Sequence, residues 1–283
     1  MIGDNCEVVL ELAGENSLSA GGIKVSPQSN LTFEGAGNLS VSATGTEAFG
    51  IGNDIDSYHG DLIFDQDGEI EVYINANKGV AIGSGMGGHI IIRRGMYKLN
   101  LMGQQSVGFG SISGDIAPLI SNGYISIKSV AQSAIGVGSV LGRCDIMIEH
   151  SSMNLDFEGS DVILIGSRHS DKLQVRVYSA TIIVRANASD LVAIGSGSGD
   201  PSDITIDYIT FRVDIGGQRA FIFKGEDKNV KVRFSNSRLE GCLFTIADIA
   251  KTEQAMDLEM TGCLYKLDIN GEMIERNSIK SSS

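Results

Sequence analysis

Polar side chains recur in this sequence at the end of a short motif, where they could bind a ligand. In each copy a serine, or once an asparagine, follows a glycine, and these residues are Asn53, Ser84, Ser111, Ser139, Ser167 and Ser196. A row of hydroxyl groups can donate to and accept hydrogen bonds from the hydroxyls of a polysaccharide. Serines at chain corners also hydrogen-bond backbone groups, which is the alternative role. The row is therefore a candidate ligand-binding face.

Acidic residues and a histidine follow the first copy of this motif. They are Asp54, Asp56, His59 and Asp61. Carboxylate oxygens are ligands that Ca²⁺ prefers, so the segment could hold calcium, although it lacks the length and terminal glutamate of an EF-hand loop. Solvated turn residues explain the same pattern without an ion. Apart from calcium we expect no cofactor.

A third group, comprising Asp61, Asp65 and Asp67 near Arg93 and Arg94, could support acid–base chemistry. Paired carboxylates cleave glycosidic bonds, and a basic residue beside a calcium site serves lyase chemistry. No single repeat gathers a convergent set of titratable groups. The sequence also contains no GxSxG, HExxH, P-loop or dinucleotide-binding motif. We assign no catalytic residue, and an enzyme is the less favoured reading.

The repeated motif itself predicts the fold. Equivalent apolar positions are separated by 31, 27, 28, 28, 29 and 29 residues, and they are Ile51, Ile82, Phe109, Val137, Ile165, Ile194 and Phe223. Each interval also contains two short runs of alternating apolar and polar residues, which is the period of a half-buried strand. A constant period of this length is typical of a solenoid. We expect an all-β, parallel β-helix with three short strands per coil and about nine coils of roughly 28 residues.

Composition limits the partners. The net charge of −13 disfavours direct binding of nucleic acid. No apolar run approaches the roughly 18 residues that cross a bilayer, so we expect no membrane insertion. The four cysteines, Cys6, Cys144, Cys242 and Cys263, are far apart and predict free thiols rather than disulfides. Free thiols and the lack of a signal peptide are compatible with a cytoplasmic location.

The two ends depart from the repeat. We expect one solenoid domain over 1–271, a polar and mobile tail over 272–283, and a short helix near 246–255, where the composition favours helix. Only seven residues precede the first strand, and the end of a solenoid needs cover. This predicts either a further domain upstream or two rods that meet end to end.

Residues 8–90 resemble a group of repeat-rich bacterial proteins, many from gut Firmicutes. The matching pieces, in order, are Leu10 to Leu18, Gly22 to Val25, Leu31 to Val41 and Ala48 to Gly52. The resemblance implies a β-helix at the cell surface, of a kind described as carbohydrate-binding-like or of unknown function. It supplies no catalytic residues. The sequence departs from this group after about residue 115, where charged corners replace the Gly-Gly endings.

Together these observations predict a non-catalytic binding or adhesion module of a bacterial protein, which contacts polysaccharide through a stacked polar face. The first alternative is a polysaccharide lyase or glycoside hydrolase of the β-helix type. The second is a structural or sensing domain of a larger regulator.

Overall fold

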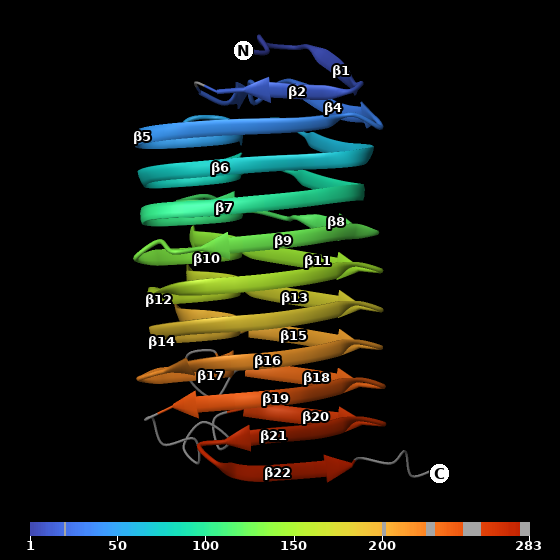
Figure 1. Cartoon of the computed structure of the whole chain (residues 1–283), viewed down its shortest axis with the longest axis vertical. Helices are drawn as coiled ribbons and strands as arrows, with labels where there is room; N and C mark the ends of the chain where they lie inside the picture. Colours follow the sequence, from blue (N-terminus) through green and yellow to red (C-terminus); the bar gives the residue numbers. More distant parts are fainter. Residues whose placement is uncertain (20, 200–201, 225–229, 246–255, 278–283) are drawn as a thin grey trace.

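The computed structural model describes residues 1–19, 21–199, 202–224, 230–245 and 256–277. These residues form an all-β rod in which parallel coils stack into a solenoid of about eight turns, spaced by about 28 residues (Figure 1). The predicted β-helix is therefore confirmed, with a number of turns close to the nine expected. The N-terminus lies at one end of the rod and the last strand at the other.

Each full coil contributes three strand segments, and each segment pairs in parallel with its equivalents in the neighbouring coils. The first segments are β1 (Glu7–Leu12), β4 (Asn30–Gly35), the starts of β6 (Leu62–Ser84) and β7 (Ile90–Ser111), β8 (Leu119–Ser121), β11 (Cys144–Glu149), β13 (Leu173–Tyr178), β15 (Ser202–Asp207), β18 (Val230–Ser235) and β20 (Met256–Thr261).

The second segments are β2 (Glu15–Leu18), β5 (Asn38–Gly52), the middle of β6 and of β7, β9 (Gly123–Ser129), β12 (Ser152–Ser170), β14 (Thr181–Gly199), β16 (Thr210–Gly217), β19 (Arg238–Thr245) and β21 (Leu264–Ile269). The third segments are β3 (Ile23–Lys24), the ends of β5, β6 and β7, β10 (Ser133–Leu141), the ends of β12 and β14, and β17 (Arg219–Lys224).

Several strands are longer than the sequence predicted. β6 and β7 each run through all three segments, and Figure 1 shows the long strands folding back at one edge of the rod. The register explains this continuity, because Ala76 still pairs with Gly103 and Lys78 with Gln105 where the chain bends. The backbone ladder therefore continues around the second corner of the coil, and no loop interrupts it.

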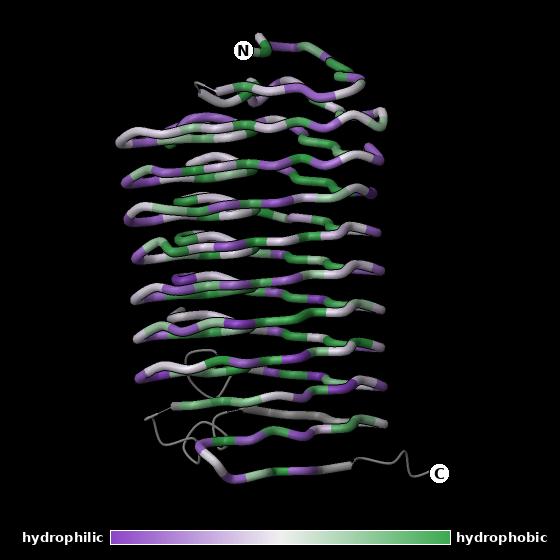
Figure 2. Tube along the Cα trace, viewed as in Figure 1, coloured by the Kyte–Doolittle hydropathy of each residue, from purple (hydrophilic) through white to green (hydrophobic). Residues whose placement is uncertain are grey.

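Apolar side chains in register form the core. Ile82 pairs with Phe109, and Phe109 with Val137, as the period predicted, and all three are fully buried. Phe33 and Phe64 stack with ring centroids 4.9 Å apart. Figure 2 shows the alternation of hydrophobic and hydrophilic residues along the coils that places one set inside.

The third segment is buried on both faces, which explains why its motif reads as a run of apolar residues. A second apolar cluster lies apart from the main core and contains Val80, Val107, Ile112, Ile135, Val140, Ile163 and Val192. Phe49, Ile55 and Phe221 pack against it. A strand covered on both sides needs apolar residues at successive positions, in contrast to the half-exposed second segment.

The glycine of the motif is required by the stacking of coils. Gly138 has a φ of +150°, and a Cβ built there would lie 1.6 Å from the carbonyl oxygen of Gly166 in the next coil. At the equivalent glycines of the other coils a Cβ would also clash with a carbonyl oxygen of the next coil, and their φ values lie between +135° and +147°. Only glycine combines this backbone angle with this contact.

The C-terminal end corrects the predicted domain boundary. β22 (Glu272–Asn277) pairs antiparallel with β21, so residues 272–277, predicted as part of a mobile tail, form a strand along the outer edge of β21. An antiparallel hairpin satisfies the outer edge of β21 and ends the stack. The helix predicted near 246–255 lies outside the described residues, as do residues 278–283.

All four cysteines are free thiols, as predicted. Cys144 and Cys263 are buried, whereas Cys242 is exposed and Cys6 is half-buried.

Candidate functional site

The predicted serine row exists, and its hydroxyls are inside the rod. Ser84, Ser111, Ser139, Ser167 and Ser196 are paired in register from coil to coil, and each has an exposed fraction of 0%. Each donates to a backbone carbonyl two or three residues further on, over distances between 2.6 and 3.0 Å. The serines therefore fix the turn that follows the third segment, and their hydroxyls do not reach the surface.

Asn53, the first member of the row, also closes the turn that follows it with its side chain. Its side chain donates to the carbonyl of Tyr58 at 2.9 Å and accepts from the amide of Asp54 at 2.9 Å. Asn53 is only half-buried, but both ends of its amide group are occupied by the loop that it closes. A ligand at this corner would have to compete with these local hydrogen bonds.

The side chains of Asp54, Asp56, His59 and Asp61 do not converge on one point. Asp54 pairs with Lys24 at 2.5 Å, and Asp61 contacts His89 Nδ1 at 3.0 Å. Asp56 is exposed, and it forms no salt bridge with any residue in the described ranges. His59 is buried, with its Nδ1 2.6 Å from the carbonyl of Gly60. Within the described residues no group of three or more His, Cys, Asp or Glu side chains is arranged to hold a metal ion.

Burial governs the protonation of His59. Desolvation is the largest influence on it and lowers its pKa to about 4, against a smaller opposing effect of the hydrogen bond to Gly60. His59 is therefore neutral at pH 7. A neutral ring with Nδ1–H bonded to a carbonyl is a packing element of the corner.

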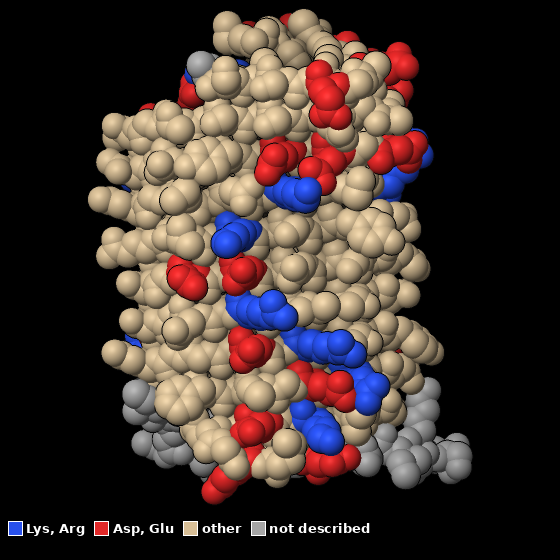
Figure 3. Space-filling model, viewed as in Figure 1, with Lys and Arg blue, Asp and Glu red and all other residues tan. Residues whose placement is uncertain are grey.

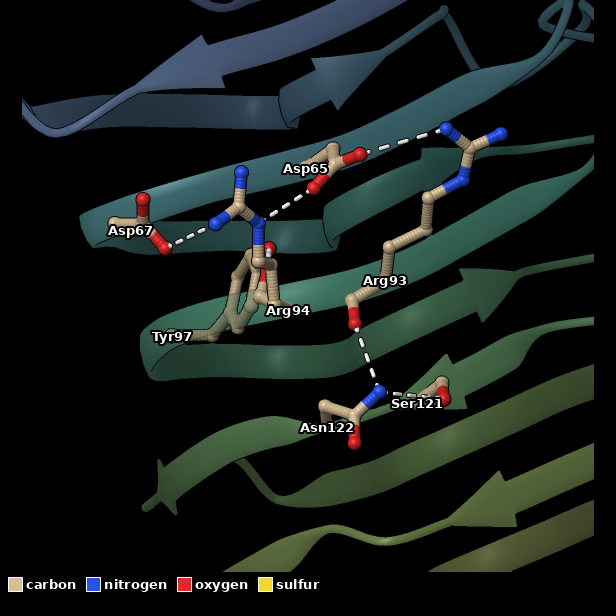
Figure 4. Close-up of polar contacts among 7 residues, drawn as sticks. All are labelled: Asp65, Asp67, Arg93, Arg94, Tyr97, Ser121 and Asn122. Carbon is tan, nitrogen blue, oxygen red and sulfur yellow. Dashed lines mark hydrogen bonds and ion pairs between the residues drawn. The ribbon is translucent and has the colours of Figure 1, made fainter.

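The group considered for catalysis is an ion-pair network (Figure 4). Arg94 Nε donates to Asp65 at 2.6 Å and its Nη1 donates to Asp67 at 2.6 Å, while Arg93 reaches Asp65 at 3.5 Å. The hydroxyl of the buried Tyr97 donates to the backbone carbonyl of Arg94 at 2.8 Å. This hydrogen bond ties the backbone at Arg94 to the core. The network joins β6 to β7 at the one place where their register shifts.

The electrostatics of this network do not suit general acid catalysis. The hydrogen bond from Arg94 lowers the pKa of the Asp65 carboxyl group. A glycosidase acid needs a carboxyl group whose pKa is raised, so that it still carries a proton near neutral pH. Asp65 is instead held ionised and paired.

Charged residues elsewhere form a column along the rod, which Figure 3 shows as alternating blue and red side chains. The register places Asp156 between Lys128 and Arg185, and Arg185 in turn beside Asp214. Opposite charges on neighbouring strands contribute about 0.2–1 kcal/mol per pair. The column thus helps to hold coils in register.

A polar groove lies at the second corner, where the long strands bend. It has a volume of about 670 Å³, and its ten lining residues, all polar, come from five consecutive coils. One column of the lining is set by the strand register and contains Glu47, Lys78, Gln105, Ser133 and Asp161. The column beside it contains the corner residues Thr46, Asn77, Gln104, Gln132 and Ser160. We call these ten residues the amide groove.

Free hydrogen-bonding capacity distinguishes the amide groove from the serine row. Asn77, Gln104 and Gln132 are exposed, and within the described part of the chain their side-chain amides make no hydrogen bond. Each amide offers two donors and an acceptor, which is the complement of a sugar hydroxyl. Equivalent residues on neighbouring coils are about 4.8 Å apart. The groove therefore presents repeated donor and acceptor groups along the rod axis.

Sequence reasoning missed this groove because its residues share polarity but not identity. The signal was a polar pair just before each apolar motif, as in Asn77-Lys78 and Gln104-Gln105. Among the described residues, no helix has the length and apolar character that a bilayer crossing requires.

Comparison with models of protein families, with curated proteins and with solved structures found no match to this chain. The resemblance to bacterial surface β-helices over residues 8–90 stays a prediction.

Proposed function

We propose that this chain is a non-catalytic binding or adhesion module that contacts polysaccharide through the amide groove. The observation that carries the proposal is the alignment of Asn77, Gln104 and Gln132, whose exposed amides lie on successive coils in a groove lined only by polar residues. The spacing of about 4.8 Å between coils is close to the length of one sugar unit in an extended chain. A rigid stack keeps these groups in place before the ligand arrives, which reduces the entropic cost of binding.

The charges of the groove favour a neutral saccharide. Glu47 and Lys78 face each other on adjacent coils, and Asp161 is paired with Arg168 at 2.9 Å. The remaining lining residues are uncharged. With a net charge of −13 on the whole chain, an anionic polysaccharide would be repelled at long range.

A glycan array followed by calorimetry tests the proposal. We expect a neutral polysaccharide to bind, and the triple variant Asn77→Ala, Gln104→Ala, Gln132→Ala to lose at least about tenfold in affinity, since each lost hydrogen bond costs about 0.5–1.5 kcal/mol. Asn154→Ala is the matched control, because Asn154 is an exposed amide outside the groove. Repeating the titration with calcium present tests whether an ion takes part. Equal binding by the triple variant and the control would refute the proposal.

A further inference from the structure

The first coil presents an open strand edge. Among the described residues β1 pairs only with β4 and β2 only with β5, so the other side of each strand faces the end of the rod. The third segment of this coil is closed, because the amide of Ile2 donates to the carbonyl of Lys24 at 2.8 Å. Figure 1 shows β1 and β2 at the N-terminal end with no strand above them. At the opposite end β22 covers the outer edge of β21.

The core is uncovered at this end. Leu10 and Leu18 are 37% and 41% exposed, whereas their partners in the next coil, Phe33 and Val41, are 0% exposed. Val8 is also half-buried where its partner Leu31 is buried. A further strand stacked on β1 and β2 would bury these side chains in the way every other coil buries its own.

The hydrogen bonds of β1 show which backbone groups await a partner. The carbonyls of Cys6 and Leu12 both accept from the second coil, at 2.9 Å in each case. Alternate residues of a strand direct their backbone groups to opposite sides. Glu7, Val9 and Glu11 therefore direct their N–H and C=O groups out of the end of the rod, and no described residue pairs with them.

Charge indicates what kind of strand fits. Glu7 and Glu11 project from β1, Glu11 lies directly beside Glu34, and Glu34 beside Asp65, so acidic residues are stacked without alternation. In the described part of the chain neither Glu11 nor Glu34 has an ion-pair partner, whereas Asp65 is neutralised by Arg94. Two copies meeting at this end would oppose like charges, which destabilises a cross-strand pair.

We propose that the edge of β1 binds an extended, basic segment of a partner protein by strand addition. The segment would place lysine or arginine opposite Glu7 and Glu11 and apolar residues over Val8 and Leu10. Main-chain hydrogen bonds then supply affinity and the alternating side chains supply specificity. This surface is distinct from the amide groove, so the inference does not depend on polysaccharide binding.

Fluorescence anisotropy with two synthetic six-residue peptides tests the inference. One carries lysine at its first and fifth positions with valine and threonine between them, and the other carries glutamate in place of lysine. We expect the lysine peptide to bind to the full chain and the glutamate peptide to bind at least about fivefold more weakly, because only the first can pair with Glu7 and Glu11.

Two variants make the test specific. Val9→Pro removes an N–H that points out of the rod and leaves the β1–β4 ladder intact. We expect it to weaken peptide binding at least about fivefold, whereas Val9→Ala keeps the N–H and should keep the affinity. Glu11→Lys reverses one charge and should shift the preference towards the glutamate peptide even if Val9→Pro does not fold. Failure of the lysine peptide to bind, equal affinity for both peptides, or a dimer in light scattering that Val9→Pro abolishes would overturn the inference.

Discussion

Ser111 Oγ lies 2.8 Å from Ser139 Oγ, within hydrogen-bond distance across adjacent coils, with both side chains completely buried. Ser139 in turn donates to the carbonyl of Leu141 at 2.6 Å. The serine row, which the sequence suggested as a binding face, is thus a line of buried side chains. Each hydroxyl closes one turn, and some also link two coils.

Removing one of these hydroxyls should lower stability and leave ligand binding intact. We expect Ser139→Ala to reduce the free energy of unfolding by about 1–3 kcal/mol, because buried backbone and hydroxyl groups lose their partner. Urea denaturation followed by circular dichroism measures the change. Asn154→Ala, at an exposed position, should change it by less than about 0.5 kcal/mol. A Ser139→Ala protein as stable as that control would contradict the structural role.

The glycine column gives a sharper test of coil stacking. We expect Gly138→Ala to cost about 3 kcal/mol or more, since its Cβ would meet the Gly166 carbonyl and its backbone angle is strained. Gly123→Ala is the matched control, because its nearest atom would be 3.4 Å away. Thermal unfolding of the two variants compares them. Similar melting temperatures for the two proteins would argue against the observed contact.

One corner offers a route to greater stability. Tyr208 is 64% exposed and has a φ of +53°, a left-handed conformation that asparagine adopts more readily than tyrosine. We expect Tyr208→Asn to raise the free energy of unfolding by about 0.5–1 kcal/mol. Tyr124→Asn, at an equally exposed strand position, should not be stabilising, because asparagine is a poor strand residue. A loss of stability in Tyr208→Asn would be evidence that the ring makes a contact that matters.

His59 should make stability depend on pH. Its folded pKa, about 4, lies below the ordinary value of 6.5, so between these values the unfolded chain binds a proton that the folded chain does not. Stability therefore falls as the pH drops from 6.5 to 4, by at most about 1.4 kcal/mol per pH unit from this group. We expect the urea unfolding midpoint of His59→Gln to change less with pH across that window than the midpoint of the wild-type chain. His150→Gln, at an exposed position, should keep the wild-type slope.

The repeat made the fold predictable, because a constant period fixes which residues are neighbours even when their structure is unknown. Ile82, Phe109 and Val137 were placed together on this ground alone. The continuous ladder through Ala76 and Lys78 was missed because polar residues at a corner read as a loop. β22 was missed because Glu272 to Asn277 occurs once and has no repeat to compare with.

The site was harder to predict, because a period identifies a column of residues but not the side to which they point. Ser84 and Ser111 each follow a glycine with positive φ, and both side chains are fully buried. Asn77 and Gln104 form a column whose members differ in type, so no repeated letter marked them. The acidic segment was misleading for a simpler reason: Lys24 and His89, from neighbouring coils, pair with the carboxylates of Asp54 and Asp61.

The most direct test of the proposed function is a crystal structure of the chain with a neutral oligosaccharide of about five units, a length that matches five coils at a spacing of about 4.8 Å. We predict that the sugar lies along the rod axis and accepts hydrogen bonds from the amides of Asn77, Gln104 and Gln132. A sugar ordered at another face, or a groove that stays unoccupied at saturating concentration while the chain binds the same sugar in solution, would contradict the account.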